Sequence, residues 1–384
     1  MDFVEPAEHR ELRCAVGAIT DKFGASYFAE RATARESTDE LWRELAAHGF
    51  IGINFAEEFG GGGAGMPELA IVCEETAARG CPLLLLLVSS AISGELIGKY
   101  GSDEQRREWL PRMAAGATKV VFAITEPDAG SNTHRITTSA RRDGDDYVLT
   151  GTKYYISGVD EAGALIVVAR TGQHEITGAP QLSLFLVPTD VPGLVKNRLP
   201  VGISLPEKQF TLHFDDVRLP SGALIGEEHS GFRQVFDGLN PERITGAALC
   251  VGIGRYAIEK GAAYARNRSV WGTAIGSHQA IAHPLAKAKI DIDLAALITS
   301  KAAWLHHHGL PAGEESNVAK YTAADAALSA VDHVIQLHGG NGLSAEYGLI
   351  PQWSVARLLR IAPVSSEMVL NYVAQHSLRL PRSY

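Results

Sequence analysis

The stretch Phe122-Ala-Ile-Thr-Glu-Pro-Asp-Ala-Gly-Ser-Asn132 decides how the rest of the chain is interpreted. Its first three residues form an apolar run that is typical of the end of a strand. Pro127 blocks continuation of that strand, and Gly130 supplies a flexible turn. The turn leaves the hydroxyls of Thr125 and Ser131, with backbone N–H groups, to bind a flat polar ligand. A plain turn at the end of a strand is the alternative interpretation.

The composition is that of a globular protein without a nucleic-acid surface. The chain has 384 residues, which allows two or three domains with a large buried core. Hydrophobic residues make up 46% and charged residues 21%, which is ordinary for such a protein. The net charge of −9 and the lack of a basic block argue against a nucleic-acid partner. The 4 cysteines have no zinc-site or C-x-x-C spacing, which indicates thiols in a reducing compartment.

Neither the first residues nor the most apolar run predicts a targeting or membrane segment. The acidic sequence MDFVEPAEHRELR lacks the apolar core of a signal peptide. The run from Leu83 to Val88 is too short to span a bilayer, which needs about 20 residues. We therefore expect a buried helix at this run, and a soluble cytoplasmic protein without a membrane partner.

The periodicity of apolar residues changes twice along the chain and predicts an α+β fold. Helical spacing, then alternating β-rich runs with Gly and Pro between them, then helical spacing again predict three domains, with boundaries at 1–119 (N-terminal helical domain), 120–225 (central β domain) and 226–384 (C-terminal helical bundle). The expected helices are 36–50, 67–79, 103–115, 243–267, 279–304, 317–337 and 353–380. The expected strands are two within 140–157, around an Asp-Gly turn, and 164–169, 182–187 and 210–214.

Three conspicuous motifs are better explained by structure than by chemistry. His306-His-His308 does not predict a metal site, because consecutive helical residues point in different directions. Gly252-Ile-Gly254 lies inside a helical pattern and follows no strand, so it indicates close helix packing rather than dinucleotide binding. Ser131 and Ser157 lack a G-x-S-x-G setting and an obvious His/Asp pair, which gives serine hydrolase chemistry little support.

Three other motifs leave a structural and a functional interpretation open. The segment His338-Gly-Gly-Asn-Gly342 is either a turn or a cradle where backbone approaches a ligand. Arg268 and Trp271 are either surface and packing residues or partners of a phosphate and an aromatic ring. Glu242 is either a carboxylate stabilised by the dipole at a helix start or a general base at the mouth of an apolar cleft.

Taken together and in order, these segments resemble the acyl-CoA dehydrogenase family of flavoenzymes. The resemblance begins with the helix-loop at Glu57 and covers nearly the whole chain. It rests on the ordered motifs Thr125–Ser131, Gly151–Ser157, Phe214–Pro220, Arg268–Gly272 and Gln336–Gly342. It implies an N-terminal helical domain, a central β-barrel-like domain and a C-terminal four-helix bundle, assembled as a homotetramer or dimer.

The resemblance also implies FAD as the cofactor and assigns residues to it. On the flavin ring lie Phe122, Ile124, Thr125 and Ser131 of the first strand and turn, with Tyr155 and Ser157 of a second strand. Arg268 and Trp271 match residues that reach the FAD of a neighbouring subunit, with Ile275, His278 and Gln279 nearby. Gln336, Gly339 and Gly340 match the turn that receives the pyrophosphate, and Ser365 and Glu367 match contacts on the adenosine side.

The family oxidises the Cα–Cβ bond of an acyl thioester, and the resemblance places the catalytic base at an unusual position. Most relatives take the base from a Glu-Gly-Thr turn late in the chain, which aligns with Pro363 here. A minority, including the isovaleryl-CoA type, use the glutamate of Leu-x-x-Glu-Arg, which aligns with Glu242. Arg243 and Ser131 would then contact the substrate. Proline has no N–H to offer to the thioester carbonyl, so Val364 is a candidate to replace it.

Several functions remain compatible with this resemblance. An acyl-CoA dehydrogenase that passes electrons to an electron-transfer flavoprotein is the leading hypothesis. The alternatives are a dehydrogenase acting on an acyl- or peptidyl-carrier protein, an acyl-CoA oxidase, and a flavin-binding partner subunit without activity of its own. Pro363 favours the last alternative, and Glu242 opposes it.

Overall fold

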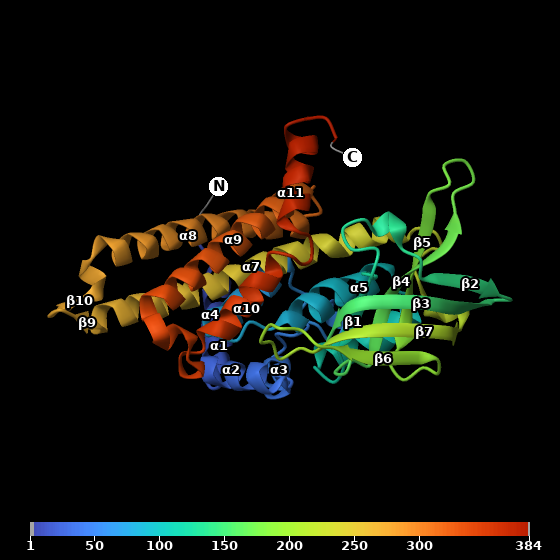
Figure 1. Cartoon of the computed structure of the whole chain (residues 1–384). Coiled ribbons are helices and arrows are strands. Elements are labelled where there is room, and N and C mark those ends of the chain that lie inside the picture. The colour runs from blue at the N-terminus through green and yellow to red at the C-terminus, as the bar shows by residue number, and fades with distance from the viewer. Residues whose placement is uncertain (1–3, 383–384) are drawn as a thin grey trace.

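A computed structural model of the chain describes residues 4–382 and divides them into helices, a sheet and further helices in that order (Figure 1). The predicted sequence of helical, β and helical regions is therefore confirmed. The boundaries after residues 119 and 225 stay predictions, with β1 beginning at Val120 and β8 ending at Ile225. Residues 1–3 and 383–384 of the two terminal domains lie outside the described part of the chain.

The N-terminal region packs short helices around a very apolar central segment. The helices are α1 (Ala7–Thr20), α2 (Gly24–Ala34), α3 (Asp39–Ala47), α4 (Met66–Ala78), α5 (Glu95–Tyr100) and α6 (Asp103–Ala114), with the 3-10 turn η1 (Glu57–Phe59). The apolar run after Cys81 forms the buried helix that the sequence predicts, but residues Leu86–Gly94 adopt the wider π-helical turn η2. No helix among the described residues is both long and apolar enough to cross a membrane. The cytoplasmic location stays a prediction.

The middle region is an eight-stranded sheet in which the order β6-β7-β3-β2-β4-β5-β8 is extended by β1, paired parallel to β4. β2 and β3 form the predicted hairpin around Gly144, which has a positive φ of 68°. The strands are β1 (Val120–Ala123), β2 (Ser139–Asp143), β3 (Asp146–Ser157), β4 (Ala164–Gln173), β5 (Pro180–Pro188), β6 (Leu194–Leu199), β7 (Gln209–Leu219) and β8 (Leu224–Ile225). The 3-10 turns η3 (Thr133–Arg135) and η4 (Ser221–Ala223) join them.

The C-terminal region is a bundle of long helices with small residues at their contacts. It contains α7 (Gly231–Asn267), α8 (Gln279–His307), α9 (Gly313–His338), α10 (Leu349–Leu359) and α11 (Ser366–Tyr372). The short elements β9 (Ser269–Val270), β10 (Thr273–Ala274), η5 (Ile275–Ser277), η6 (Gly339–Leu343), η7 (Ala345–Tyr347) and η8 (Val373–Ser377) connect or end them. Gly252 confirms the predicted close packing, since a Cβ there would lie 2.2 Å from the carbonyl oxygen of Glu74.

The prediction of one helix over residues 353–380 is wrong. α10 ends at Leu359, α11 begins at Ser366, and the six residues between them form a turn that contains Pro363. Proline has no N–H for a helical hydrogen bond and disfavours helical geometry at the residue before it, which interrupts the helix here. In Figure 1, α11 therefore projects away from the axis of the bundle.

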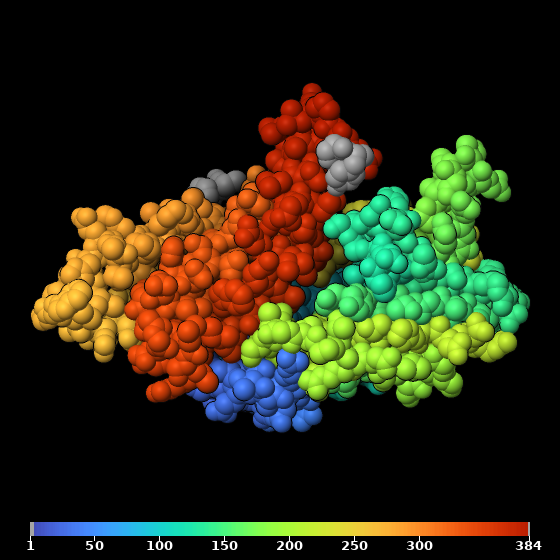
Figure 2. Space-filling model, viewed as in Figure 1, coloured from blue at the N-terminus to red at the C-terminus, as the bar shows by residue number. Residues whose placement is uncertain are grey.

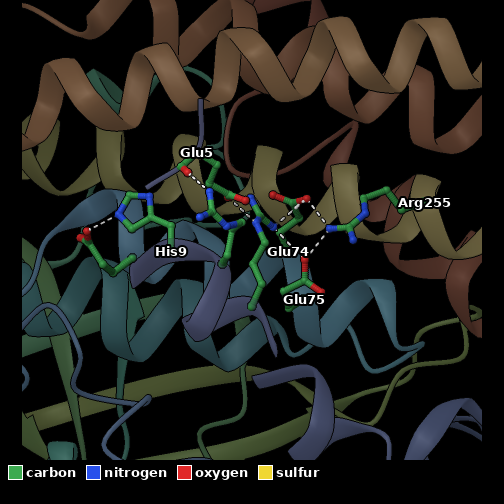
Figure 3. Close-up of polar contacts among 8 residues, drawn as sticks. Glu5, His9, Glu74, Glu75 and Arg255 are labelled. Atoms are coloured by element: carbon green, nitrogen blue, oxygen red, sulfur yellow. Dashed lines mark hydrogen bonds and ion pairs between the residues drawn. The ribbon is translucent and has the colours of Figure 1, made fainter. Parts of the chain in front are cut away.

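A network of ion pairs joins the N-terminal helices to the bundle (Figure 3). Arg13 on α1 contacts Glu5 at 2.6 Å and Glu75 on α4 at 2.8 Å, and Arg255 on α7 contacts Glu75 at 2.6 Å. Glu75 is only 2% exposed, so its carboxylate depends on these two arginines for compensation. The first helix of the chain is thereby fixed to the helix that carries Glu242.

Candidate active site

The first group of predicted flavin contacts lies where β1 and β3 meet. The backbone N–H of Tyr154 donates to the carbonyl oxygen of Thr125 at 2.8 Å and joins the end of β1 to β3. Phe122, Ile124 and Thr125 are partly buried along this junction, and the ring of Tyr155 is 54% exposed beside it. The structure therefore brings the two predicted strands together and leaves an aromatic face open toward solvent.

A buried ion pair fixes this junction from inside. The ammonium group of Lys153 on β3 donates to Glu126 and to the carbonyl oxygen of Ile124, both at 2.9 Å. Glu126 also accepts hydrogen bonds from Thr137 and Thr138 at 2.7–3.0 Å. Burial by itself raises the pKa of Glu126, but the charge of Lys153 and these donors outweigh it and lower the pKa to about 2. The carboxylate is thus fully ionised at neutral pH.

Glu242 lies in the middle of α7, and the prediction that it stands at a helix start is wrong. Pro241 favoured that prediction because proline is common at the first turn of a helix, but here it lies inside the helix. Gly238 and Gly246 flank Glu242 by one turn on the same face of α7. Added Cβ atoms at these glycines would meet the side chains of Leu96 and Leu87 at 3.1 Å and 3.5 Å. Glu242 therefore faces apolar side chains.

The surroundings of Glu242 favour its protonated form. Burial raises the pKa of the carboxyl to about 8, and the charges of Arg243 and Lys320 limit the shift. Arg243 is 7% exposed, donates to Asn240 at 3.0 Å, and keeps its Nε without a hydrogen-bond partner among the described residues. Burial lowers the pKa of Arg243. A carboxyl with a raised pKa and an incompletely paired cation are thus consecutive residues of one helix.

The surface near this region is hollowed. Figure 2 shows a hollow between the red C-terminal segment and the teal segment that follows β1. The teal segment includes Ser131, which is exposed, and the red segment includes the turn between α10 and α11. An acyl thioester that entered here would pass between the β region and the bundle. Pro363, which the resemblance aligns with the usual base, lies in this turn.

The second group of predicted cofactor residues lines a separate cavity of about 350 Å³ at the far end of α7. Its walls include Arg268, Ile275, Gln336, Gly339 and Gly340. Gly339 has a positive φ of 59°, and an added Cβ at either glycine would meet nothing within 4 Å, so backbone is open to a ligand there. This set of a cation, open glycine backbone and an amide side chain fits the phosphates of a dinucleotide.

Aromatic stacking shapes the floor of this cavity. The ring of His338 lies 3.9 Å from that of Tyr264, and burial lowers the pKa of this histidine, which keeps the ring neutral. Asn341 donates to the hydroxyls of Tyr264 and Tyr347 at 3.2 Å. The turn at Gly339–Gly342, for which the sequence allowed two interpretations, is therefore held by side-chain contacts and faces solvent.

The remaining predicted cofactor residues lie outside the walls of this cavity, most of them exposed at the surface. Trp271 is 96% exposed at the tip of the hairpin of β9 and β10, and His278 and Gln279 are exposed at the start of α8. The hydroxyl of Ser365 caps α11 by accepting from the N–H of Met368 at 3.3 Å, and Glu367 is exposed in the first turn. Ser157 pairs with Gln209 at 3.0 Å near the first group.

One chain does not bring the two groups of cofactor residues together. Twenty-six residues of helix and its last turn separate Glu242 from Arg268, or about 39 Å at 1.5 Å per residue. Figure 1 shows the hairpin of β9 and β10 and the strands β1 and β3 at opposite ends of the molecule.

The sequence analysis did not predict that Lys153 and Lys320 are buried, although the pattern around each residue indicates it. Lys153 follows Tyr147, Leu149 and Gly151 on the inward register of β3, so alternation places it inside. Lys320 continues the apolar stripe of α9 and is 2% exposed. No group of His, Cys, Asp and Glu side chains among the described residues is placed to hold a metal ion.

Helices, a sheet and a second helical bundle in this order, with a buried carboxyl on the longest helix of the bundle, are the arrangement that the resemblance to a flavoprotein oxidoreductase predicts. Sequence models of the acyl-CoA dehydrogenase N-terminal, middle and C-terminal domains match residues 6–117, 121–217 and 229–378. The chain therefore belongs to the acyl-CoA dehydrogenase family, and it is an FAD-dependent enzyme of that family.

Relatives and solved structures agree with this assignment over the full length. Acyl-CoA dehydrogenase FadE12 of Mycobacterium tuberculosis H37Rv is 51% identical over 384 residues, covering 100% of this chain and 99% of that protein. The butyryl-CoA dehydrogenase structure from Megasphaera elsdenii matches with a TM-score of 0.93 at 26% identity, covering 99% and 100% of the two chains. A glutaryl-CoA dehydrogenase from Mycobacterium smegmatis in complex with FADH2 matches with a TM-score of 0.92 at 26% identity, covering 99% and 96%.

The raised pKa of Glu242 predicts a pH-dependent cost to stability. Its folded-state pKa of about 8 exceeds the ordinary value of a glutamate, 4.5, so folding favours the protonated carboxyl. The cost is absent below about pH 4.5, grows as pH rises through the folded-state pKa, and is constant above it. We expect Glu242→Gln to be more stable than the wild type by on the order of 4–5 kcal/mol at pH 9 and by less than about 1 kcal/mol at pH 5. Chemical denaturation at both pH values measures this difference, and an equal difference at both would contradict it.

Proposed function

We propose that the protein dehydrogenates an acyl-CoA between its α and β carbons, with Glu242 as the base that removes the α proton. The observation that carries the proposal is the position of Glu242 on α7, facing apolar side chains with its pKa raised to about 8. A base of this strength abstracts a weakly acidic proton better than an ordinary carboxylate does. Pro363 cannot perform this role.

The substrate carbonyl has to be polarised for this proton to become acidic enough. No acceptor among the described residues receives a hydrogen bond from the N–H of Val364, which makes this group available to the thioester oxygen. We assign contacts with the carrier part of the substrate to Arg243 and Ser131. Bound FAD supplies the acceptor for the hydride that leaves the β carbon.

We propose that each FAD is held by two copies of the chain. The junction of β1 and β3 would hold the flavin ring, with Phe122, Ile124, Thr125, Ser131, Tyr155 and Ser157. The cavity at the far end of α7 would hold the phosphates of the FAD of the other copy, since it lies about 39 Å along the helix from Glu242. Gln279, His278, Trp271, Ser365 and Glu367 would complete the contacts between copies.

An exposed apolar stripe on α8 supports such a homo-oligomer. Ile290, Leu294, Leu297 and Trp304 are 51–60% exposed and recur on one face of the helix. Side chains of this kind on a solvent face are typical of a subunit contact. The resemblance favours a tetramer or dimer, and an electron-transfer flavoprotein as the electron acceptor.

A charge in this stripe should break the assembly and release the cofactor. We expect Leu294→Glu combined with Leu297→Glu to shift the protein to monomers, because two carboxylates would be buried at the contact. The dissociation constant for FAD should rise at least about tenfold, since half of the site would be lost. Analytical ultracentrifugation and FAD titration measure both effects. Ser300→Glu, an exposed position beside the stripe, is the control, and a variant that stays assembled would contradict the contact.

The test of the proposed function uses the purified protein with FAD and a panel of thioesters. Anaerobic stopped-flow absorbance should show bleaching of the flavin by at least one acyl-CoA, and transfer of electrons to an electron-transfer flavoprotein. If only acyl-carrier-protein thioesters bleach the flavin, the substrate is carried by a carrier protein rather than by CoA. Hydrogen peroxide release in air at the turnover rate would indicate an oxidase. A flavin that no thioester reduces would overturn the proposal.

A further inference from the structure

Lys320 is a buried cation that the reaction described above does not use. It lies on α9, on the face that packs against the other helices of the bundle, and is 2% exposed. A buried ammonium group is costly unless hydrogen bonds and opposite charge compensate it. Burial lowers the pKa of Lys320 to about 8, which shows that this compensation is incomplete.

The ammonium group of Lys320 binds the turn that replaces the usual catalytic turn of the family. It donates to the carbonyl oxygen of Arg360 at 3.2 Å and to the carbonyl oxygen of Val364. A second tether from α9 reaches the same turn, where Asp325 pairs with Arg360 at 2.8 Å. These contacts hold both ends of the segment around Pro363. They also fix the peptide plane that follows Val364.

The same ammonium group acts electrostatically on Glu242. Its charge lowers the proton affinity of Glu242 and acts as well on Cys250, both on α7. The other charged groups that act on Lys320 or Glu242 are Asp325, Glu367 and Arg243. Lys320 is therefore the cation from outside α7 that acts on the candidate base.

We propose that Lys320 is a positioning residue that holds the turn around Val364 in place and acts through its charge on the candidate base Glu242. The proposal rests on the proposed role of Glu242. The turn has Pro363 where the resemblance places the usual glutamate, and Lys320 ties this turn to α9, which packs against α7, the helix of the candidate base. A lysine suits this task, because its ammonium group has three N–H donors, of which two serve the carbonyl oxygens of Arg360 and Val364.

Removing the charge of Lys320 separates this role from simple packing. Lys320→Met keeps the length and apolar stem but removes the donors and the charge. The midpoint at which Glu242 ionises, followed by infrared titration of its carboxyl stretch against Glu242→Gln, should rise by about one pH unit. The midpoint pH of the acid limb in the pH profile of the flavin-reduction rate should rise by the same amount. The maximal rate should fall about tenfold, because the turn is no longer held.

The remaining variants make the result decisive. Lys320→Arg keeps the charge and should restore the midpoint, while Lys22→Met, which removes an exposed surface ion pair with Glu44, should change neither readout. An unchanged midpoint in Lys320→Met would overturn the proposal. If Lys320→Met does not bind FAD, the infrared titration is made on Lys320→Gln instead. If neither variant folds, Lys320 has a structural role only and the proposal is overturned. If Glu242→Gln still reduces its flavin, the proposed base is wrong, whatever Lys320 does.

Discussion

Glu242→Gln should bind FAD normally and lose reduction of the flavin by substrate. The amide has nearly the shape of the carboxyl but cannot accept the α proton at any accessible pH. General bases contribute about 10²–10⁴-fold to a rate, and we expect a loss near the upper end because Pro363 offers no substitute. Single-turnover stopped-flow absorbance with a thioester that reduces the wild type measures the effect.

The control for this prediction lies on the same helix. Glu259 is an exposed glutamate of α7, and Glu259→Gln should reduce its flavin at the wild-type rate. Glu242→Asp should keep measurable activity, since a carboxylate remains but is withdrawn by one methylene group. Comparable rates for Glu242→Gln and the wild type would remove this residue from the mechanism.

Lys153→Met should destabilise the protein strongly and weaken its hold on FAD. The change leaves the buried carboxylate of Glu126 without its cation and the carbonyl oxygen of Ile124 without its donor. Breaking a buried pair in this way costs about 3–5 kcal/mol. The junction of β1 and β3 should loosen, so FAD should be lost at lower denaturant concentration. Denaturant unfolding followed by flavin fluorescence measures both.

A double variant distinguishes the pair from either residue alone. Glu126→Gln combined with Lys153→Met leaves no uncompensated charge and should recover part of the stability. Lys208→Met, which removes the more exposed pair of Lys208 and Asp160 in the same domain, should cost less than about 1 kcal/mol. Additive losses in the double variant would show that the two side chains do not stabilise each other.

Periodicity predicted the elements well where one face of a helix or strand is buried. The hairpin of β2 and β3 and the strands β4, β5 and β7 appear where alternation and turn residues indicated. The predictions failed at two prolines, because a proline can either lie within a long helix or interrupt one. Pro241 lies inside a helix that begins ten residues earlier, and Pro363 interrupts what reads as one helix. Local rules cannot separate these cases, because packing of the whole bundle stabilises α7 across its proline.

The sequence by itself determined the order of helical and β regions, and the order of its motifs carried the resemblance to the family, since both depend on residue identity along the chain. The prediction that Glu242 rather than Pro363 is the base rests on that resemblance. Only the tertiary structure decided that Glu242 faces apolar side chains and that the two groups of cofactor residues lie far apart in one chain. It also revealed two buried cations: Lys153, at the junction of β1 and β3, and Lys320, whose charge acts on Glu242. Burial, and with it the pKa of a carboxyl, depends on segments distant in sequence, which no local pattern records.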